Sequence, residues 1–196
     1  MLLPEGEYRY EVRRGTELIA TEHESLRGGK IAGERRIADG QNRHEVEAAL
    51  DENGQIVRLS LSYVRGPFTR SASYEADGDF LRGSVSALAG RNVVSAKLGR
   101  LREIDADLVL FRALIIAHMR QRGQTRWTGR VATVDSNTLV AASSKQSCRV
   151  KSDDGKVWLY EPRMGDFEEI EIDAEGRILR RRDSRGIETK LIAALP

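Results

Sequence analysis

The sequence predicts a mainly β protein: a long, curved antiparallel meander sheet of the spiral β-roll or half-barrel type, wrapped around one central buried α-helix at about 105–121. Three observations predict it. Short runs alternate apolar and charged residues, turn signals recur along the chain, and one helical segment is apolar on almost every side. A twisted sheet can enclose such a helix, whereas a flat sheet covers only one side of it.

The first run, 7–13, shows the strand pattern clearly. Tyr8, Tyr10 and Val12 alternate with charged residues, so the apolar side chains share one face. This pattern predicts a strand with one face in the core and one in solvent.

Nine turn signals separate the runs, and each contains Asp, Asn or Gly, which suit tight hairpins. Spacings of commonly 10 to 14 residues indicate an antiparallel meander of a dozen or so strands. The signals lie at 14–15, 28–29, 39–40, 51–54, 77–78, 135–137, 153–155, 173–176 and 184–186.

The predicted helix has an acidic N-cap candidate, Asp105, and a glycine C-cap candidate, Gly123. Its apolar residues cover nearly the whole helical circle, which is typical of a buried helix. At about 16 residues it is too short to span a bilayer. Small residues on predicted inner faces leave space for this helix or for a ligand; they are Ala48, Ala72, Gly83 and Ala87.

Composition indicates one soluble domain over 1–196. Charged residues make up 32% of the chain, the net charge is +2, and no apolar run is long enough for a signal peptide or a spanning helix. We therefore expect a cytoplasmic protein.

The lone Cys148 excludes an internal disulfide, and the three histidines form no metal-binding motif, so no metal or cofactor is expected.

Charge is unevenly distributed. Residues 108–152 carry eight Lys and Arg against one acid, Asp135. This excess indicates either a surface that binds anions or basic residues placed at a helix C-terminus, where cations are favoured.

Nucleic acid is not an expected partner, because aromatic residues are only 6% of the chain and show no stacking motif. The acidic run 166–175 precedes an arginine-rich run, 177–185, and this pair predicts a solvated hairpin with cross-strand ion pairs.

The order of these features resembles bacterial spiral β-roll families, among them a glycolipid-binding family, and more distantly the periplasmic lipoprotein carriers. The resemblance is carried by the hairpins at 49–59 and 170–179 and by the embedded helix at 107–121. It implies a hydrophobic ligand on the concave side of the sheet.

The expected function is non-enzymatic binding of a lipophilic or amphiphilic ligand. Arg112 and His118 lie on the apolar helix, so each needs a partner, an exit to solvent or an anionic headgroup. The candidate ligand-binding residues are Arg112, His118, Arg126, Trp127 and Arg130.

Two alternatives stay open at this point. One is an interaction module that forms homodimers or binds another protein through an open sheet edge. The other is an enzyme of unrecognised type that uses Cys148 with a histidine, or the acidic hairpin, in a pocket.

Overall fold

The computed structural model describes residues 2–87, 90–100 and 102–196, and places these residues in one 15-stranded sheet and one helix. The elements are β1 (Gly6–Arg14), β2 (Glu17–Arg27), β3 (Lys30–Ile37), β4 (Asn42–Leu50), β5 (Ile56–Arg65), β6 (Phe68–Asp77), β7 (Phe80–Ala87), β8 (Gly90–Lys97), β9 (Ile104–Asp105), α1 (Val109–Gln121), β10 (Arg126–Val134), β11 (Ala141–Val150), β12 (Val157–Arg163), β13 (Asp166–Ile172), β14 (Ile178–Asp183) and β15 (Ile187–Leu195).

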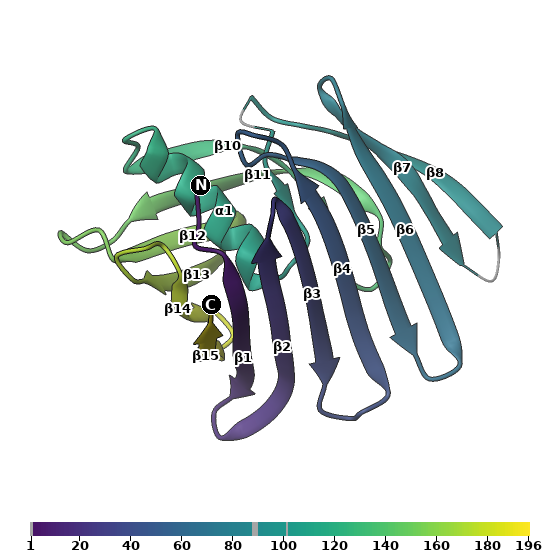
Figure 1. The fold of residues 1–196 in the computed structure, drawn as a ribbon, viewed down its shortest axis with the longest axis horizontal. Helices are drawn as coiled ribbons and strands as arrows, with labels where there is room; N and C mark the ends of the chain where they lie inside the picture. Colours follow the sequence, from purple (N-terminus) through teal and green to yellow (C-terminus); the bar gives the residue numbers. More distant parts are fainter. Residues whose placement is uncertain (1, 88–89, 101) are drawn as a thin grey trace.

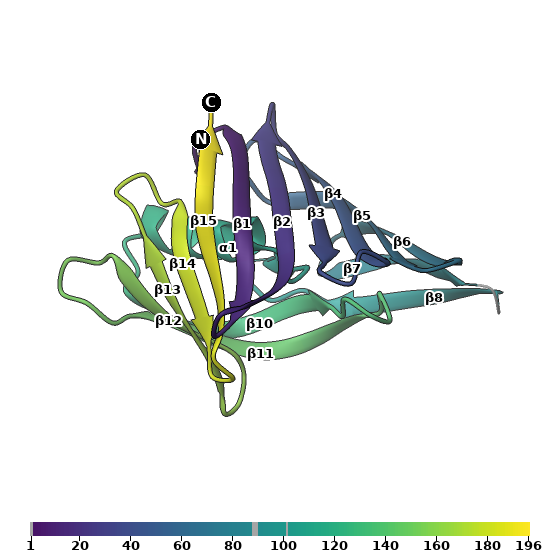
Figure 2. The same ribbon diagram turned by 90° about the horizontal axis from the view of Figure 1, so that it is seen from below.

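Two meanders form the sheet. One runs from β8 back to β1, the other from β15 back to β10, and the first and last strands join them in antiparallel pairing. The two-residue strand β9 pairs in parallel with β10. Figures 1 and 2 show the result, two curved arms that meet where β1 lies beside β15.

The helix fills the concave space between the arms, and in Figure 2 it lies behind β15 and β1. All residues of α1 from Val109 to Met119 are buried. Just before the helix, Leu108 packs over Gly33 of β3, where any larger side chain would meet the leucine methyl groups. The core is therefore built jointly by the inner faces of the strands and by every side of α1.

The predicted fold class is confirmed, and each of the nine predicted turns connects antiparallel neighbours. Two further turns in the described chain are not among those predicted: one at Gly66 between β5 and β6, and one at Gly165 between β12 and β13. The N-cap prediction is wrong. Asp105 belongs to β9 and Asp107 has a φ of 61°, so the helix begins only at Val109, after an N-cap position at Leu108 that carries no side-chain cap.

The free edge of the longer arm is β8, and its end approaches the other arm. The Ser143 hydroxyl donates to the Lys97 carbonyl at 2.7 Å, so the two arms touch at this point. In the described part of the chain, no helix has the length and hydropathy needed to cross a membrane.

Candidate functional site

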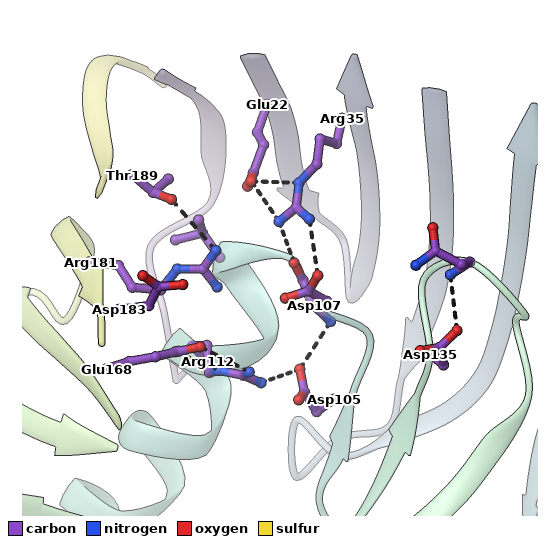
Figure 3. Close-up of polar contacts among 12 residues, drawn as sticks. Glu22, Arg35, Asp105, Asp107, Arg112, Asp135, Glu168, Arg181, Asp183 and Thr189 are labelled. Atoms are coloured by element: carbon purple, nitrogen blue, oxygen red, sulfur yellow. Dashed lines mark hydrogen bonds and ion pairs between the residues drawn. The ribbon is translucent and has the colours of Figure 1, made fainter. Parts of the chain in front are cut away.

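Two regions beside α1 combine polar groups with open space, one at each end of the helix. The helix-start cluster is a largely buried network of acids and arginines, and Figure 3 labels all of its members except Glu24. It consists of Glu22, Glu24, Arg35, Asp105, Asp107, Arg112, Glu168, Arg181 and Asp183. The second region, here called the helix-end cleft, lies beside the C-terminal half of α1.

Arg112 is held inside the helix-start cluster by two carboxylates. Its Nε donates to Glu168 Oε2 at 3.0 Å, its Nη1 forms an ion pair with Asp105, and its guanidinium lies 4.5 Å from the centre of the Tyr160 ring. Burial disfavours the charged form, but Asp105 and Glu168 outweigh this effect and raise the pKa of Arg112 well above its ordinary value. Arg112 is thus a buried cation satisfied by this chain's own acids.

Arg35 forms a second set of pairs. Its Nη2 lies 2.7 Å from Glu22 Oε1, and its Nη1 lies 3.0 Å from Asp107 Oδ2. Burial alone would raise the pKa of Asp107, but Arg35, together with Arg181 and Arg112, overcomes this effect and holds that pKa at about 2. Arg35 therefore joins β2 and β3 to the segment that enters the helix.

Glu24 supplies the cap that the helix sequence lacks. Its two carboxyl oxygens accept the backbone N–H groups of Val109 and Leu110, each at 2.8 Å. Burial, with the Glu22 carboxyl beside it, raises the pKa of Glu24 well above its usual range. Glu24 therefore takes up a proton more readily than an isolated glutamate does.

A period-two pattern could have identified three of these residues from sequence. Along β2, Glu22 and Glu24 occupy inward positions between Ala20 and Leu26, and Glu168 of β13 shares its face with Ile170 and Ile172. Arg181 gives no such signal, because a bulge between Glu171 and Ile172 shifts the register of β14. The predicted solvated hairpin is therefore correct for Arg177, which pairs with Asp173 at 2.6 Å, and wrong for Glu168 and Arg181, which are buried.

Open space adjoins the helix-start cluster on two sides. One cleft of about 400 Å³ is lined by Arg112 and includes Asp105, Asp107 and Glu168. A smaller cleft of about 250 Å³ lies against β1, β2 and β15 and is lined by Arg181. Residues of the cluster thus line two small clefts.

The helix-end cleft is larger, about 710 Å³, and has an amphiphilic lining. Leu3, Leu26 and Leu114 are each only 3% exposed and form its floor with Ala117. The remaining lining residues are Leu2, Gly29, Leu50, Asp51, Glu52, Asn53, Gly54, Arg120, Gln121 and Glu175.

Several rim groups of this cleft are already engaged. The Asp51 carboxylate accepts the backbone N–H groups of Asn53 and Gln55 at 2.9 Å each, and Arg120 donates to the Ala174 carbonyl at 3.1 Å. Glu52 and Gln121 are exposed, and among the described residues their side chains take part in no hydrogen bond or ion pair. These two side chains are available to a ligand.

The five predicted ligand-binding residues do not share one cavity. The cleft that Arg112 lines contains none of the other four. His118 is buried, and its Nδ1 lies 3.0 Å from Glu103 Oε1. Its Nε2 has no hydrogen-bond partner in the described chain and lies near Gly54, a residue of the helix-end cleft, where a Cβ on that glycine would be 3.7 Å from it.

The other three residues lie on β10. Arg126 and Arg130 are exposed on one face, opposite Arg149 and Lys145 of β11, while Trp127 packs against the core. The basic segment therefore forms an outward-facing strip on β10 and β11 instead of a cavity mouth.

Cys148 lies in the core at 1% exposure, and burial raises its pKa to about 12. At neutral pH the thiol stays protonated, so Cys148 does not supply the thiolate that a cysteine nucleophile requires.

Comparisons with known proteins support the architecture. No protein-family model matches the sequence, and no curated protein matches it. A crystal structure of a DUF1089 family protein from Pseudomonas aeruginosa matches this structure with a TM-score of 0.60 and 16% identity, over 84% of this chain and 89% of that chain. At this identity the likeness shows a shared β fold alone.

Proposed function

We propose that the protein is a non-enzymatic binding protein that holds a small amphiphile on the concave side of the sheet, in the helix-end cleft. One observation carries the proposal: a cleft of about 710 Å³ with a floor of buried leucines and a rim of polar side chains. Ligand sites in proteins are commonly about 300–1,000 Å³ and mostly apolar, with a few polar groups for orientation.

The rim favours an uncharged, hydroxyl-bearing headgroup. Its ionic residues are three acids, Asp51, Glu52 and Glu175, against Arg120 alone. A second negative charge brought to this rim would be repelled, whereas sugar or glycerol hydroxyls can donate to carboxylates and to the Gln121 amide. An anionic headgroup at Arg112 is disfavoured, because Asp105 and Glu168 already neutralise that arginine.

Native mass spectrometry of the purified protein, paired with organic extraction, tests the proposal. We expect a bound mass of lipid size, or uptake of an added alkyl glycoside or monoacylglycerol. Ala117→Leu narrows the cleft and should abolish that mass, while Ala194→Leu, at an exposed position on β15, should leave it unchanged.

Because Ala117 is buried, circular dichroism must first show that its variant folds. Leu2→Asp provides a second test at a half-buried position, since it places a charge on the lining without changing α1. A bare mass that persists after incubation with both amphiphiles, or uptake that all three variants retain, would contradict the proposal.

A second candidate function is self-association through β8. This strand ends the sheet, and Val93 is 87% exposed on it, which is a common arrangement for strand addition. Light scattering should then show a concentration-dependent dimer that Val93→Lys abolishes. A monomer at every concentration would rule this function out.

A further inference from the structure

A cleft of about 500 Å³ lies on the concave face of the longer arm, beside the turn between β5 and β6. The antiparallel register sets Arg65 opposite Phe68 and Tyr63 opposite Arg70, so these four side chains share one face of the sheet. Tyr63 packs against the buried core, which identifies this face as the concave one. Asn137, from the turn between β10 and β11, lines the cleft from the other arm.

Two arginines give this cleft a positive charge, and no acid belongs to its described lining. Arg65 and Arg70 are diagonal neighbours on adjacent strands, a separation that long side chains can bridge to reach one ligand. Arg70 Nη1 donates to the Asn137 carbonyl at 2.5 Å. Arg65 is exposed and takes part in no hydrogen bond or ion pair in the described chain. Both guanidinium groups therefore keep donors that an anion can use.

Two acids outside the lining lie close by, and both serve turns. Asp39 attracts Arg65, but its carboxylate accepts two backbone N–H groups of its own turn, at 2.9 and 3.1 Å. Asp135 likewise accepts two backbone N–H groups of the β10–β11 turn, at 3.1 and 2.7 Å. In the described chain neither acid forms an ion pair with an arginine of the cleft.

The same cleft offers an aromatic surface. Phe68 is 57% exposed, and Tyr63 is held by stacking on His44, with ring centres 4.4 Å apart. His44 is uncharged at pH 7, because burial lowers its pKa to about 4. An aromatic ligand can stack on the Phe68 ring and leave water there, whereas a hydrated inorganic anion gains nothing from that ring.

We propose that this cleft binds a planar aromatic molecule that carries an anionic group, a carboxylate or a phosphate, with the ring on Phe68 and the anion on Arg65 and Arg70. Guanidinium groups bind both kinds of oxyanion through paired N–H donors. The volume lies within the usual range for small-molecule sites. This site is separate from the helix-end cleft, so it goes beyond the proposed function and does not depend on it.

Isothermal titration calorimetry with sodium 2-naphthoate and with 2-naphthyl phosphate tests the site. The wild-type protein should bind at least one of them in the micromolar to millimolar range, and the ratio of the two affinities shows which anion is preferred. Cyclohexanecarboxylate lacks the aromatic ring and 2-naphthylmethanol lacks the charge, so each should bind about tenfold more weakly or not at all. Added salt should weaken binding of the naphthyl anions, because the arginines are accessible to solvent.

Arg65→Gln and Phe68→Ser should each weaken binding by about tenfold. Both side chains are exposed, so circular dichroism should show the wild-type fold. The matched controls are Arg58→Gln, on the opposite face of β5, and Phe80→Ser, on the opposite face of β7, and both should bind like the wild type.

Three results would each overturn the proposal: no binding by the wild type, wild-type binding by both Arg65→Gln and Phe68→Ser, or equal binding of the uncharged naphthyl alcohol. Displacement of the naphthyl anion by an excess of an alkyl glycoside would place it in the helix-end cleft and would overturn the proposal as well.

Discussion

At the residue scale, the charged groups of the interior serve different purposes. Arg112 and Arg35 are each held by two carboxylates, while Arg181 hydrogen-bonds to the Thr189 hydroxyl. The sequence could show that Arg112 needed a partner, because it lies on an apolar helix, but it could not show which one. Glu168 is 56 residues away, and antiparallel folding alone brings it to the helix.

Arg112→Met should destabilise the protein by about 3–5 kcal/mol, because it leaves Asp105 and Glu168 buried without their cation. Amphiphile uptake by the folded fraction should not change. Urea unfolding measures the free energy of unfolding, and native mass spectrometry measures amphiphile uptake. Combination with Glu168→Gln should cost less than the sum of the two single changes; loss of uptake with unchanged stability would instead assign Arg112 to the ligand.

His44 gives a pH prediction. It stacks on Tyr63 with ring centres 4.4 Å apart, and burial, reinforced by Arg35, lowers its pKa from 6.5 to about 4. Between these values the unfolded chain binds the proton more readily, so the contribution of His44 to stability is present above pH 6.5 and is lost as the pH falls toward 4.

The expected loss is about 1–2 kcal/mol after allowance for partial solvent screening. The measurement is the free energy of urea unfolding of the wild type and of His44→Gln, each from pH 7.5 to pH 4. The difference between the two curves is the quantity of interest, because the carboxyl groups add the same pH dependence to both proteins. Parallel curves for the two proteins would show that His44 is not the group responsible.

At the element scale, α1 begins through a long-range contact. The sequence offered Asp105 as the cap, yet Glu24 of β2 accepts the first two helical N–H groups. A cap supplied by a strand 85 residues earlier leaves no local signal, which is why the helix start was misplaced while its glycine-terminated end was found.

Glu24→Gln should lower the free energy of unfolding by about 1–2 kcal/mol, because an amide can accept only one of the two helical hydrogen bonds through its oxygen. Glu17→Gln, an exposed change on the same strand, is the control. Equal urea midpoints for the two variants would show that the cap contributes nothing.

At the scale of the whole molecule, the termini join the two arms. Alternating residues and glycine turns predicted the strands one by one, and these local signals sufficed for the meander and for the enclosed helix. The pairing of β1 with β15 and the approach of β8 to β11 are tertiary results that no local pattern contains. The candidate ligand residues on β10 were expected to converge with Arg112, but Arg126 and Arg130 lie on the exposed face of that strand.

Photo-crosslinking can show whether an amphiphile occupies the helix-end cleft. An alkyl glycoside with a diazirine near the end of its chain would be bound, irradiated and located by peptide mass spectrometry. We expect adducts at residues that line the cleft and their loss in Ala117→Leu; these residues are Leu2, Leu3, Leu50–Gly54, Leu114, Ala117, Arg120 and Gln121. Adducts confined to other surfaces, or unchanged by that substitution, would contradict binding in this cleft.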